Sequence, residues 1–480
     1  MISRRYSAES RRTGGAAAGR YAAIAVLVAA LVAALALAVA RPASALPSHV
    51  LWSDIWSAGP GIDQYKDAAP TIDGGFVAAG VTNDSSSGDG ADIVVAKFAA
   101  ANGAPSQREW VRTWDNPFQH RFDTAWAIAT DLDGGVIASG YTNAVSGRRD
   151  WVIVKWNASG AFQWSHTFGP DLADGRATAM DVCCDGAGDV YVCGSTQTAS
   201  NAASLVVRKL DAGSGDLLWR GDYSGPAGSF NEGVALVLDD HLNAYVTGYS
   251  GRAGADRDII LVKFHTGGAS TPTWARRIDS GRHLDDEGVA LKMQGSSLYV
   301  VGGMFTTNAT RRKVALARYT TAGTRKWLRT WRDAKTAVDN LAALAVDKYG
   351  GVAVAGFSDF ASGQRHAFLV KWNKSGTRKW AKVSFPSPSK VRGYTGVVGD
   401  PAGHLWVGGY TKTGDGNSDW LVARYEPDGR RAWISQWNGS SGMDDFCSAI
   451  GLTVSGKPFA VGSIASAFTA DDAAAAKYRR

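Results

Sequence analysis

DTAWAIATDLDGGVIASGYT (residues 123–142) and DWVIVKWNASGAFQW (residues 150–164) contain every feature that decides the fold of this 480-residue chain. A run of small residues leads to a D-x-x-G turn, and a second apolar run ends at Gly140. A third run ends at Lys155-Trp156, and a fourth surrounds Trp164 after another glycine turn. Short apolar runs separated by Gly, Asp and Asn are typical of antiparallel strands joined by tight turns. We therefore predict four β-strands in this unit.

The same unit recurs along the chain with a period of about 54 residues. The glycine that ends the second run occurs at Gly80, Gly140, Gly194, Gly248, Gly302, Gly356, Gly408 and Gly462. The basic residue of the third run occurs at Lys97, Lys155, Lys209, Lys263, Arg318, Lys371, Arg424 and Lys477. The tryptophan of the fourth run occurs at Trp52, Trp110, Trp164, Trp219, Trp274, Trp327, Trp380 and Trp433. A fixed period of this length indicates an array of similar units rather than the three domains that the length suggests.

The first tryptophan, Trp52, shows how the array ends. It precedes the first complete unit, whereas the last unit stops at Arg480, soon after Lys477, and has no tryptophan run of its own. We therefore predict that the N-terminal strand completes the last unit and closes a ring. The expected fold is all-β: a single eight-bladed β-propeller, with seven blades as the alternative. Small residues in the first runs allow eight strands to crowd around a central channel.

Residues 1–45 have the composition of an export signal. They contain six arginines, an apolar stretch over residues 21–40 and the small residues Ala43-Ser44-Ala45. We predict cleavage near Leu46, which leaves residues 46–480 as one domain that works in an extracellular or cell-surface location. The alternative is an uncleaved membrane anchor, because 20 apolar residues can span roughly 30 Å of hydrocarbon.

Charge excludes one class of function. The whole chain has a formal net charge of +7, but six arginines and one glutamate belong to residues 1–45, so residues 46–480 carry only +2. This removes the case for a protein that binds nucleic acid through its overall charge. Basic pairs beside the outer tryptophans are interpreted as solvated charges that protect the outer strands, and the alternative is an edge that meets anionic wall polymers or a membrane surface. These pairs are Arg325-Lys326, Arg378-Lys379 and Arg430-Arg431.

The repeated unit resembles that of a bacterial β-propeller repeat family of extracellular proteins, which reads D-x-x-x-A-x-A-x-D-x-x-G-x-x-Y-V-x-G-x-T, then D-x-x-x-x-K, then G-x-x-x-W. The resemblance covers the whole of residues 46–480, and it implies a propeller outside the cytoplasm with no particular activity. The G-x-x-x-W element is also similar to the tryptophan-docking motif of eight-bladed quinoprotein dehydrogenases. That similarity implies an alternative cofactor, pyrroloquinoline quinone (PQQ) with calcium.

Because the blades account for residues that occur once per repeat, functional candidates are residues that break it. The most distinctive is the pair Cys183-Cys184, which is a candidate for cofactor binding because a vicinal disulfide lies beside the cofactor in quinoprotein dehydrogenases. The simpler interpretation is two small residues at a strand end, one of them bridged to Cys193. Cys447 is expected to be buried and free.

No metal site is predicted from the sequence, because the eight histidines are scattered and no calcium-loop pattern is present. Recurrent acids before the first run are interpreted as turn caps, with a cation-binding ring at one mouth of the channel as the alternative. They are Asp123, Asp174, Glu232, Asp286, Asp339 and Asp444. No catalytic constellation is found.

The sequence therefore favours a secreted or surface propeller that acts as a non-catalytic binding or scaffold module without a cofactor. Its partner is an unknown extracellular ligand: a glycan, a cell-wall polymer or a protein, with no nucleic acid. Contact with a membrane is expected only through an uncleaved leader. The alternative is a PQQ-dependent extracytoplasmic oxidoreductase, and a third class is a carbohydrate-active enzyme with paired carboxylates.

Overall fold

A computed structural model describes the chain from residue 49 to its end, with short gaps. The described ranges are residues 49–83, 90–101, 107–117, 121–143, 148–173, 175–199, 202–251, 256–281, 284–305, 312–333, 338–360, 362–384, 392–412, 417–439, 443–465 and 471–480. The expected leader over residues 1–45 and the turn cap Asp174 lie outside them. No helix in these ranges is long and apolar enough to cross a membrane.

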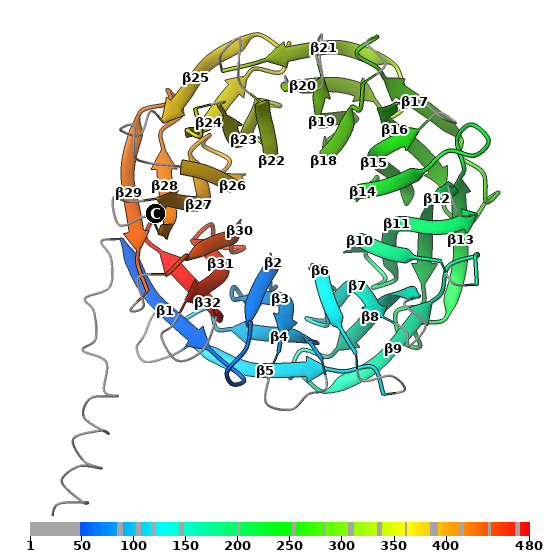
Figure 1. The fold of residues 1–480 in the computed structure, drawn as a ribbon, viewed down its shortest axis with the longest axis horizontal. Helices are drawn as coiled ribbons and strands as arrows, with labels where there is room; N and C mark the ends of the chain where they lie inside the picture. Colours follow the sequence, from blue (N-terminus) through cyan, green and yellow to red (C-terminus); the bar gives the residue numbers. More distant parts are fainter. Residues whose placement is uncertain are drawn as a thin grey trace, which may run out of the picture. The chain divides into compact units, whose positions relative to one another are not determined.

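The described residues form eight four-stranded antiparallel sheets, which surround a central channel as the blades of a ring (Figure 1). The expected eight-bladed β-propeller is confirmed, and the seven-bladed alternative is wrong. Strands follow each other from the channel to the outside within each blade.

The strand bounds follow the same order in every blade. The inner strands are β2 (Gln64–Pro70), β6 (Asp123–Thr130), β10 (Ala177–Cys184), β14 (Asn231–Leu238), β18 (Glu287–Gln294), β22 (Val338–Val346), β26 (Arg392–Gly399) and β30 (Phe446–Leu452). The second strands are β3 (Phe76–Thr82), β7 (Val136–Asn143), β11 (Val190–Ala199), β15 (Asn243–Gly251), β19 (Ser297–Phe305), β23 (Val352–Asp359), β27 (Leu405–Lys412) and β31 (Pro458–Ala465). The third strands are β4 (Asp92–Phe98), β8 (Arg149–Trp156), β12 (Ala202–Leu210), β16 (Arg257–His265), β20 (Arg312–Thr320), β24 (Arg365–Trp372), β28 (Ser418–Tyr425) and β32 (Asp471–Tyr478). The outer strands are β5 (Arg108–Trp114), β9 (Phe162–Phe168), β13 (Leu217–Tyr223), β17 (Trp274–Ile278), β21 (Arg325–Trp331), β25 (Arg378–Ser384), β29 (Arg431–Trp437) and β1 (Val50–Trp56).

The ring closes as the position of Trp52 predicts. Strand β1 pairs antiparallel with β32, and Trp52 stands opposite Lys477. The outer strand of blade 8 therefore comes from the N-terminal end of the propeller, while its other three strands come from the C-terminal end. In Figure 1 the blue strand β1 lies against the red strands of this blade.

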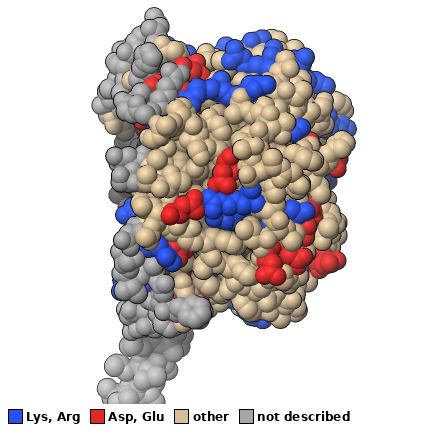
Figure 2. All heavy atoms as spheres, turned by 90° about the vertical axis from the view of Figure 1, so that its right-hand side faces the viewer, with Lys and Arg blue, Asp and Glu red and all other residues tan. Residues whose placement is uncertain are grey.

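Burial differs between the middle and the outer strands. All seven residues of β3 are buried, because its sheet is covered on both faces by neighbouring blades. In β5, Trp110 and Trp114 are buried while Glu109 and Arg112 are exposed. Figure 2 shows basic and acidic side chains close together on the outer wall. Charge of both signs discourages an exposed outer strand from pairing with another sheet.

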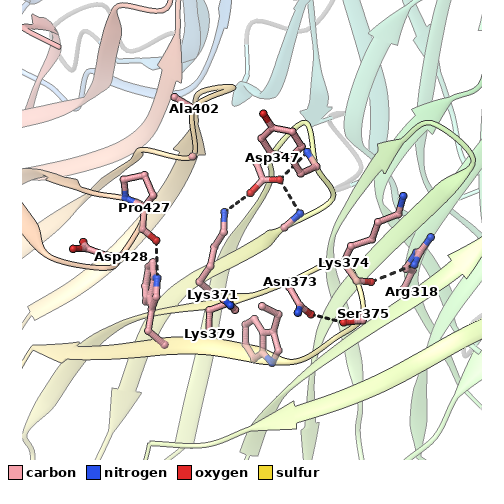
Figure 3. A pocket seen from close by; sticks show the side chains of 15 residues that line it. Arg318, Asp347, Lys371, Asn373, Lys374, Ser375, Lys379, Ala402, Pro427 and Asp428 are labelled. Carbon is pink, nitrogen blue, oxygen red and sulfur yellow. Dashed lines mark hydrogen bonds and ion pairs between the residues drawn. The ribbon is translucent and has the colours of Figure 1, made fainter.

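Two of the repeated residue series hold neighbouring blades together. The Trp380 indole N–H donates to the carbonyl of Pro427 in the next blade at 3.0 Å, as Figure 3 shows. In blade 2, Lys155 Nζ and Trp164 Nε1 both donate to the carbonyl of Ala212, at 2.7 and 3.3 Å. The same convergence joins Lys97 and Trp110 to Ala158, and Arg318 and Trp327 to Lys374. The basic and tryptophan series thus form one contact between blades.

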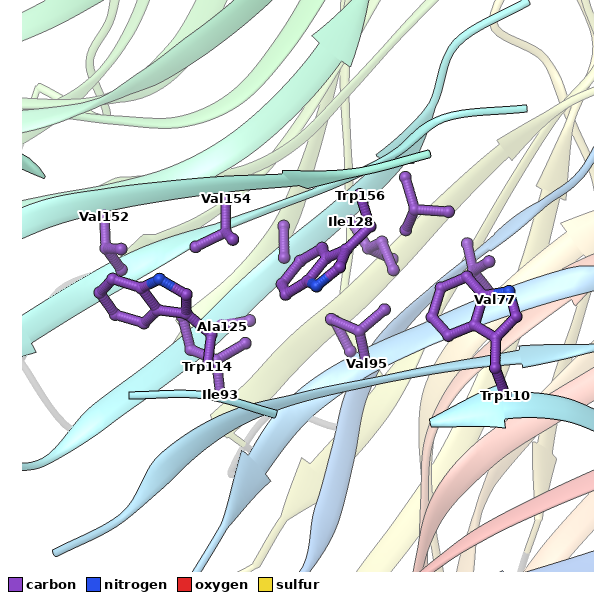
Figure 4. Close-up of a cluster of buried hydrophobic side chains, with 13 residues drawn as sticks. Val77, Ile93, Val95, Trp110, Trp114, Ala125, Ile128, Val152, Val154 and Trp156 are labelled. Carbon is purple, nitrogen blue, oxygen red and sulfur yellow. The ribbon is translucent and has the colours of Figure 1, made fainter. Parts of the chain in front are cut away.

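The hydrophobic core lies between adjacent sheets. Trp110 and Trp114 fall on one face of β5, because side chains four residues apart on a strand point the same way. Figure 4 shows both indoles beside Trp156 of blade 2, among valine and isoleucine side chains of both blades. The recurring W-x-x-x-W spacing therefore places two large side chains in one interface between blades, where a tryptophan buries roughly 150–250 Å².

Candidate axial binding site

A β-bulge in every inner strand builds the wall of the channel. In blade 1, Tyr65 pairs with Gly80 and Asp67 pairs with Ala79, so Lys66 is left without a partner in the ladder. A Cβ at Gly80 would overlap the carbonyl oxygen of Gln64, which explains why this position of the repeat is glycine. In blade 7 the residue in this place is Gly409 and not the expected Gly408, because Gly409 pairs with Tyr394.

The bulges produce a ring of eight equivalent residues. They are Lys66, Trp126, Met180, Val234, Val289, Ala342, Thr395 and Ser448. Lys66, Trp126, Ala342, Thr395 and Ser448 line a cavity of about 610 Å³, the axial cavity, formed by the inner strands of blades 1, 2 and 5 to 8. Among the eight bulge residues, Lys66 is the charged one and Trp126 is the aromatic one. These two residues therefore differ from the other blades at a position that faces the channel.

Lys66 and Trp126 contact each other. Lys66 Nζ lies 4.0 Å from the centroid of the Trp126 ring and donates to Thr124 Oγ1 at 2.7 Å. No ion pair joins Lys66 to a carboxylate of the described residues, and burial lowers the pKa of its amine to about 8. Trp126 is 42% exposed, which is unusual for so large an apolar side chain. The pair offers a cation and an accessible ring edge to a molecule in the cavity.

Two carboxylates beside the bulges have structural partners. Asp67 accepts the Ile128 N–H at 3.1 Å, and Asp181 accepts the Leu236 N–H at 2.7 Å. Each bond joins the inner strands of adjacent blades. Burial raises the pKa of both carboxyls, that of Asp181 to about 6, and the charge of Lys292 opposes the shift. A carbohydrate-active enzyme with paired carboxylates stays a prediction.

Asp123, Asp286 and Asp444 accept backbone N–H groups, as the predicted caps would, whereas Glu232 accepts the hydroxyls of Ser195 and Tyr249 and caps no turn. Asp123 accepts the Asn116 N–H at 2.8 Å, Asp286 accepts the Ser280 N–H at 2.8 Å, and Asp339 accepts the Ser358 hydroxyl at 2.7 Å. Asp444 accepts the Ser418 N–H at 2.6 Å, and Glu232 accepts the Tyr249 hydroxyl at 3.2 Å. Burial raises the pKa of Asp123 and Asp339 to about 7.

Two groups of three carboxylates also come together, one from blades 1 and 2 and the other from blade 4. They are Asp92, Asp115 and Asp123, and Asp256, Asp258 and Asp279, each with oxygens within 4.8 Å of one another. Oxygen clusters of this kind can hold a divalent cation. Neither group lines the axial cavity. Sequence spacing does not reveal them, because their members belong to different strands and loops.

The cysteine pair lies away from the axial cavity. Cys183 packs against the hydrophobic cluster that contains Cys193, and Cys184 packs against a different cluster on the other side of blade 3. All four cysteines are free, so the expected bridge to Cys193 is not formed. Burial raises the pKa of Cys184 to about 12 and that of Cys183 well above its usual value. A role of the pair in cofactor binding stays a prediction.

The fold and its closure define an eight-bladed β-propeller. Similar solved structures include "Structure of Dos1 propeller", with a TM-score of 0.55 and 10% identity over 89% of this chain and 95% of that chain. The quinohemoprotein alcohol dehydrogenase from Comamonas testosteroni has a TM-score of 0.50 and 12% identity, over 90% of this chain and 76% of that chain. No protein family and no curated protein sequence matches the chain. These similarities concern the fold alone, and the resemblance to the extracellular repeat family stays a prediction.

Proposed function

We propose that the protein is a secreted or surface-attached propeller that acts as a non-catalytic binding or scaffold module, with the axial cavity as its binding site. The observation that carries this proposal is the meeting of Lys66 and Trp126, two residues that break the repeat, inside one cavity. Most other recurrent polar residues in the described ranges serve contacts within or between blades.

Binding is tested by native mass spectrometry of the purified protein with neutral oligosaccharides, peptides and small carboxylic acids. Trp126→Ala and Lys66→Gln are expected to abolish binding of any ligand found. The matched control is Val234→Ala, because Val234 occupies the same bulge position in blade 4 but does not line the cavity. Loss of binding in the control alone, or turnover of a glycan or an alcohol by the purified protein, would refute the proposal.

The second candidate is a PQQ-dependent oxidoreductase. The exposed indole of Trp126 beside the Lys66 cation suits a flat anionic ring. The fit is incomplete, however, because the carboxylates of Asp67 and Asp181 accept backbone N–H groups. The two clusters of three aspartates also lie outside the lining of the axial cavity. Native mass spectra with PQQ and calcium separate the candidates, since a stoichiometric adduct that needs Trp126 supports the oxidoreductase and its absence supports the binding module.

A further inference from the structure

A second cavity, the turn-face groove, lies at the end of the ring where the hairpin turns gather. Its volume is about 750 Å³, and its walls come from turns of blades 6 and 7 and from Arg318 of blade 5. Figure 3 shows the contacts that hold these walls, including the bond from Lys371 to Asp347 at 2.8 Å. These contacts belong to the repeat, so the groove itself is a product of the scaffold.

Two side chains in the groove depart from the repeat. Tyr349 is the third residue of a D-x-x-G turn and is 71% exposed. The corresponding residues of other blades are Asp73, Asp133, Ala187, His241, Ala402 and Ser455. Lys374 is the second residue of the turn before the outer strand, where other blades have Ala158, Ala212 and Pro427. Blade 6 therefore presents an exposed phenol ring and an additional cation where the adjacent blade 7 presents Ala402 and Pro427.

The groove has an excess of positive charge. Four basic side chains line it against two carboxylates, and Lys371 is already paired with Asp347. Lys374 and Lys379 are exposed and form no ion pair with a carboxylate of the described residues. The second carboxylate, Asp428, lies on the blade 7 side of the groove, as Figure 3 shows.

The wall beside the groove is also basic. Strands β21 and β25 contain Arg325, Lys326, Arg329, Arg378, Lys379 and Lys382 and no acidic residue. Figure 2 shows Lys and Arg side chains gathered at the top of the view, and Figure 1 places strand β21 at the top of the ring. Of these six basic residues only Lys379 lines the groove, so the others provide controls for charge attraction alone.

We propose that the turn-face groove binds an acidic oligosaccharide, with a sugar ring against Tyr349 and a uronate carboxylate at Lys374 and Lys379. A pyranose has flat apolar faces and a polar rim, and an exposed tyrosine beside Asn373 and Ser375 offers the complementary surface. The carboxylate supplies the missing partner of the two lysines. This site is separate from the axial cavity, so it stands or falls independently of the binding proposed there.

The test is calorimetric titration of the purified protein with a galacturonate tetrasaccharide. Lys374→Gln and Tyr349→Ala are each expected to weaken binding about tenfold, as loss of one charge-assisted contact or one stacked ring would. Tyr349→Phe keeps the ring and is expected to bind like the unaltered protein. Lys379→Gln is compared with Lys326→Gln, which removes the corresponding lysine of blade 5 outside the groove. Only the former is expected to weaken binding.

Two further probes distinguish sugar recognition from simple charge attraction. Cellotetraose, which is uncharged, is expected to bind at least about tenfold more weakly than the galacturonate, and tetraglutamate is expected not to bind. Equal binding of tetraglutamate, equal effects of Lys379→Gln and Lys326→Gln, or retention on anionic phospholipid vesicles without galacturonate binding would overturn the proposal.

Discussion

Substitution of Gly376 by alanine tests whether tryptophan docking holds the ring together. Gly376 has φ +81°, and a Cβ there would lie 2.9 Å from Trp327 Cδ2 and 3.1 Å from Arg329 Nε. Gly363 of the same blade has φ +79° and no atom within 4 Å of its Cβ position. Both alanines carry the cost of a left-handed backbone, about 1–2 kcal/mol. Only Gly376→Ala also displaces the packed indole of Trp327, which adds roughly 1–3 kcal/mol to the loss of stability.

The two variants are compared by guanidinium chloride unfolding, followed through tryptophan fluorescence. We expect Gly376→Ala to lose about 1–3 kcal/mol more stability than Gly363→Ala, since overpacking is the one contribution that differs. In a Trp327→Ala background the additional loss is expected to disappear, because the colliding ring is gone. Equal destabilisation by the two alanines, or an additional loss that persists without Trp327, would refute the docking account.

Three other predictions follow from closure, buried acids and the axial lysine. Trp52→Ala is expected to lower the free energy of unfolding by about 3–5 kcal/mol, because Trp52 is only 4% exposed and belongs to the strand that closes blade 8. A loss as small as that for an exposed residue, measured by chemical unfolding, would contradict closure through β1. Burial raises the pKa of Asp123 from 3.8 to about 7, so the stability that the protonated carboxyl contributes is present below pH 4 and is lost as the pH rises through 7. Asp123→Asn should raise the melting temperature at pH 8, because the substitution removes a penalty of at most about 4 kcal/mol. At pH 4 the same substitution should change the melting temperature little. Asn231 already occupies this position in blade 4, so the amide fits the site, and an unchanged melting temperature at pH 8 would disprove the burial argument. With a pKa of about 8, the Lys66 amine is neutral in about half of the molecules at pH 8, whereas an ordinary lysine is neutral in less than about 1% of them. Mass spectrometry after brief acylation should therefore find Lys66 labelled before the other lysines. Labelling at the rate of an ordinary lysine would show that its pKa is not lowered.

Much of the docking contact could be predicted from the sequence, but its partners could not. The spacing of the tryptophans and the preceding glycines shows that each outer strand carries a tryptophan at an equivalent position, although Trp219, Trp274 and Trp380 are only half-buried in the structure. The sequence does not show that Lys155 and Trp164 share the carbonyl of Ala212, since that residue is 48 positions beyond Trp164 and in another blade. The carboxylate partner of Lys155 is Asp131, at 2.9 Å, and not Asp150, five residues before it. Two residues five positions apart on a strand point to opposite faces, so Asp150 does not reach the amine.

The sequence alone determined the strand pattern, the number of blades and the closing strand. These properties are local and repeated: each turn residue and each apolar run acts within a few positions, and eight copies of the signal favour eight blades over the alternative of seven. The tertiary structure alone decided which residues meet across blades. Lys66 and Trp126 are 60 residues apart, and only the bulges that the repeated glycines permit, together with the ring of inner strands, place them in one cavity. Tyr349 and Lys374 are 25 residues apart in the sequence, and they both line the turn-face groove because the sheet of blade 6 places its β22–β23 and β24–β25 turns at the same end.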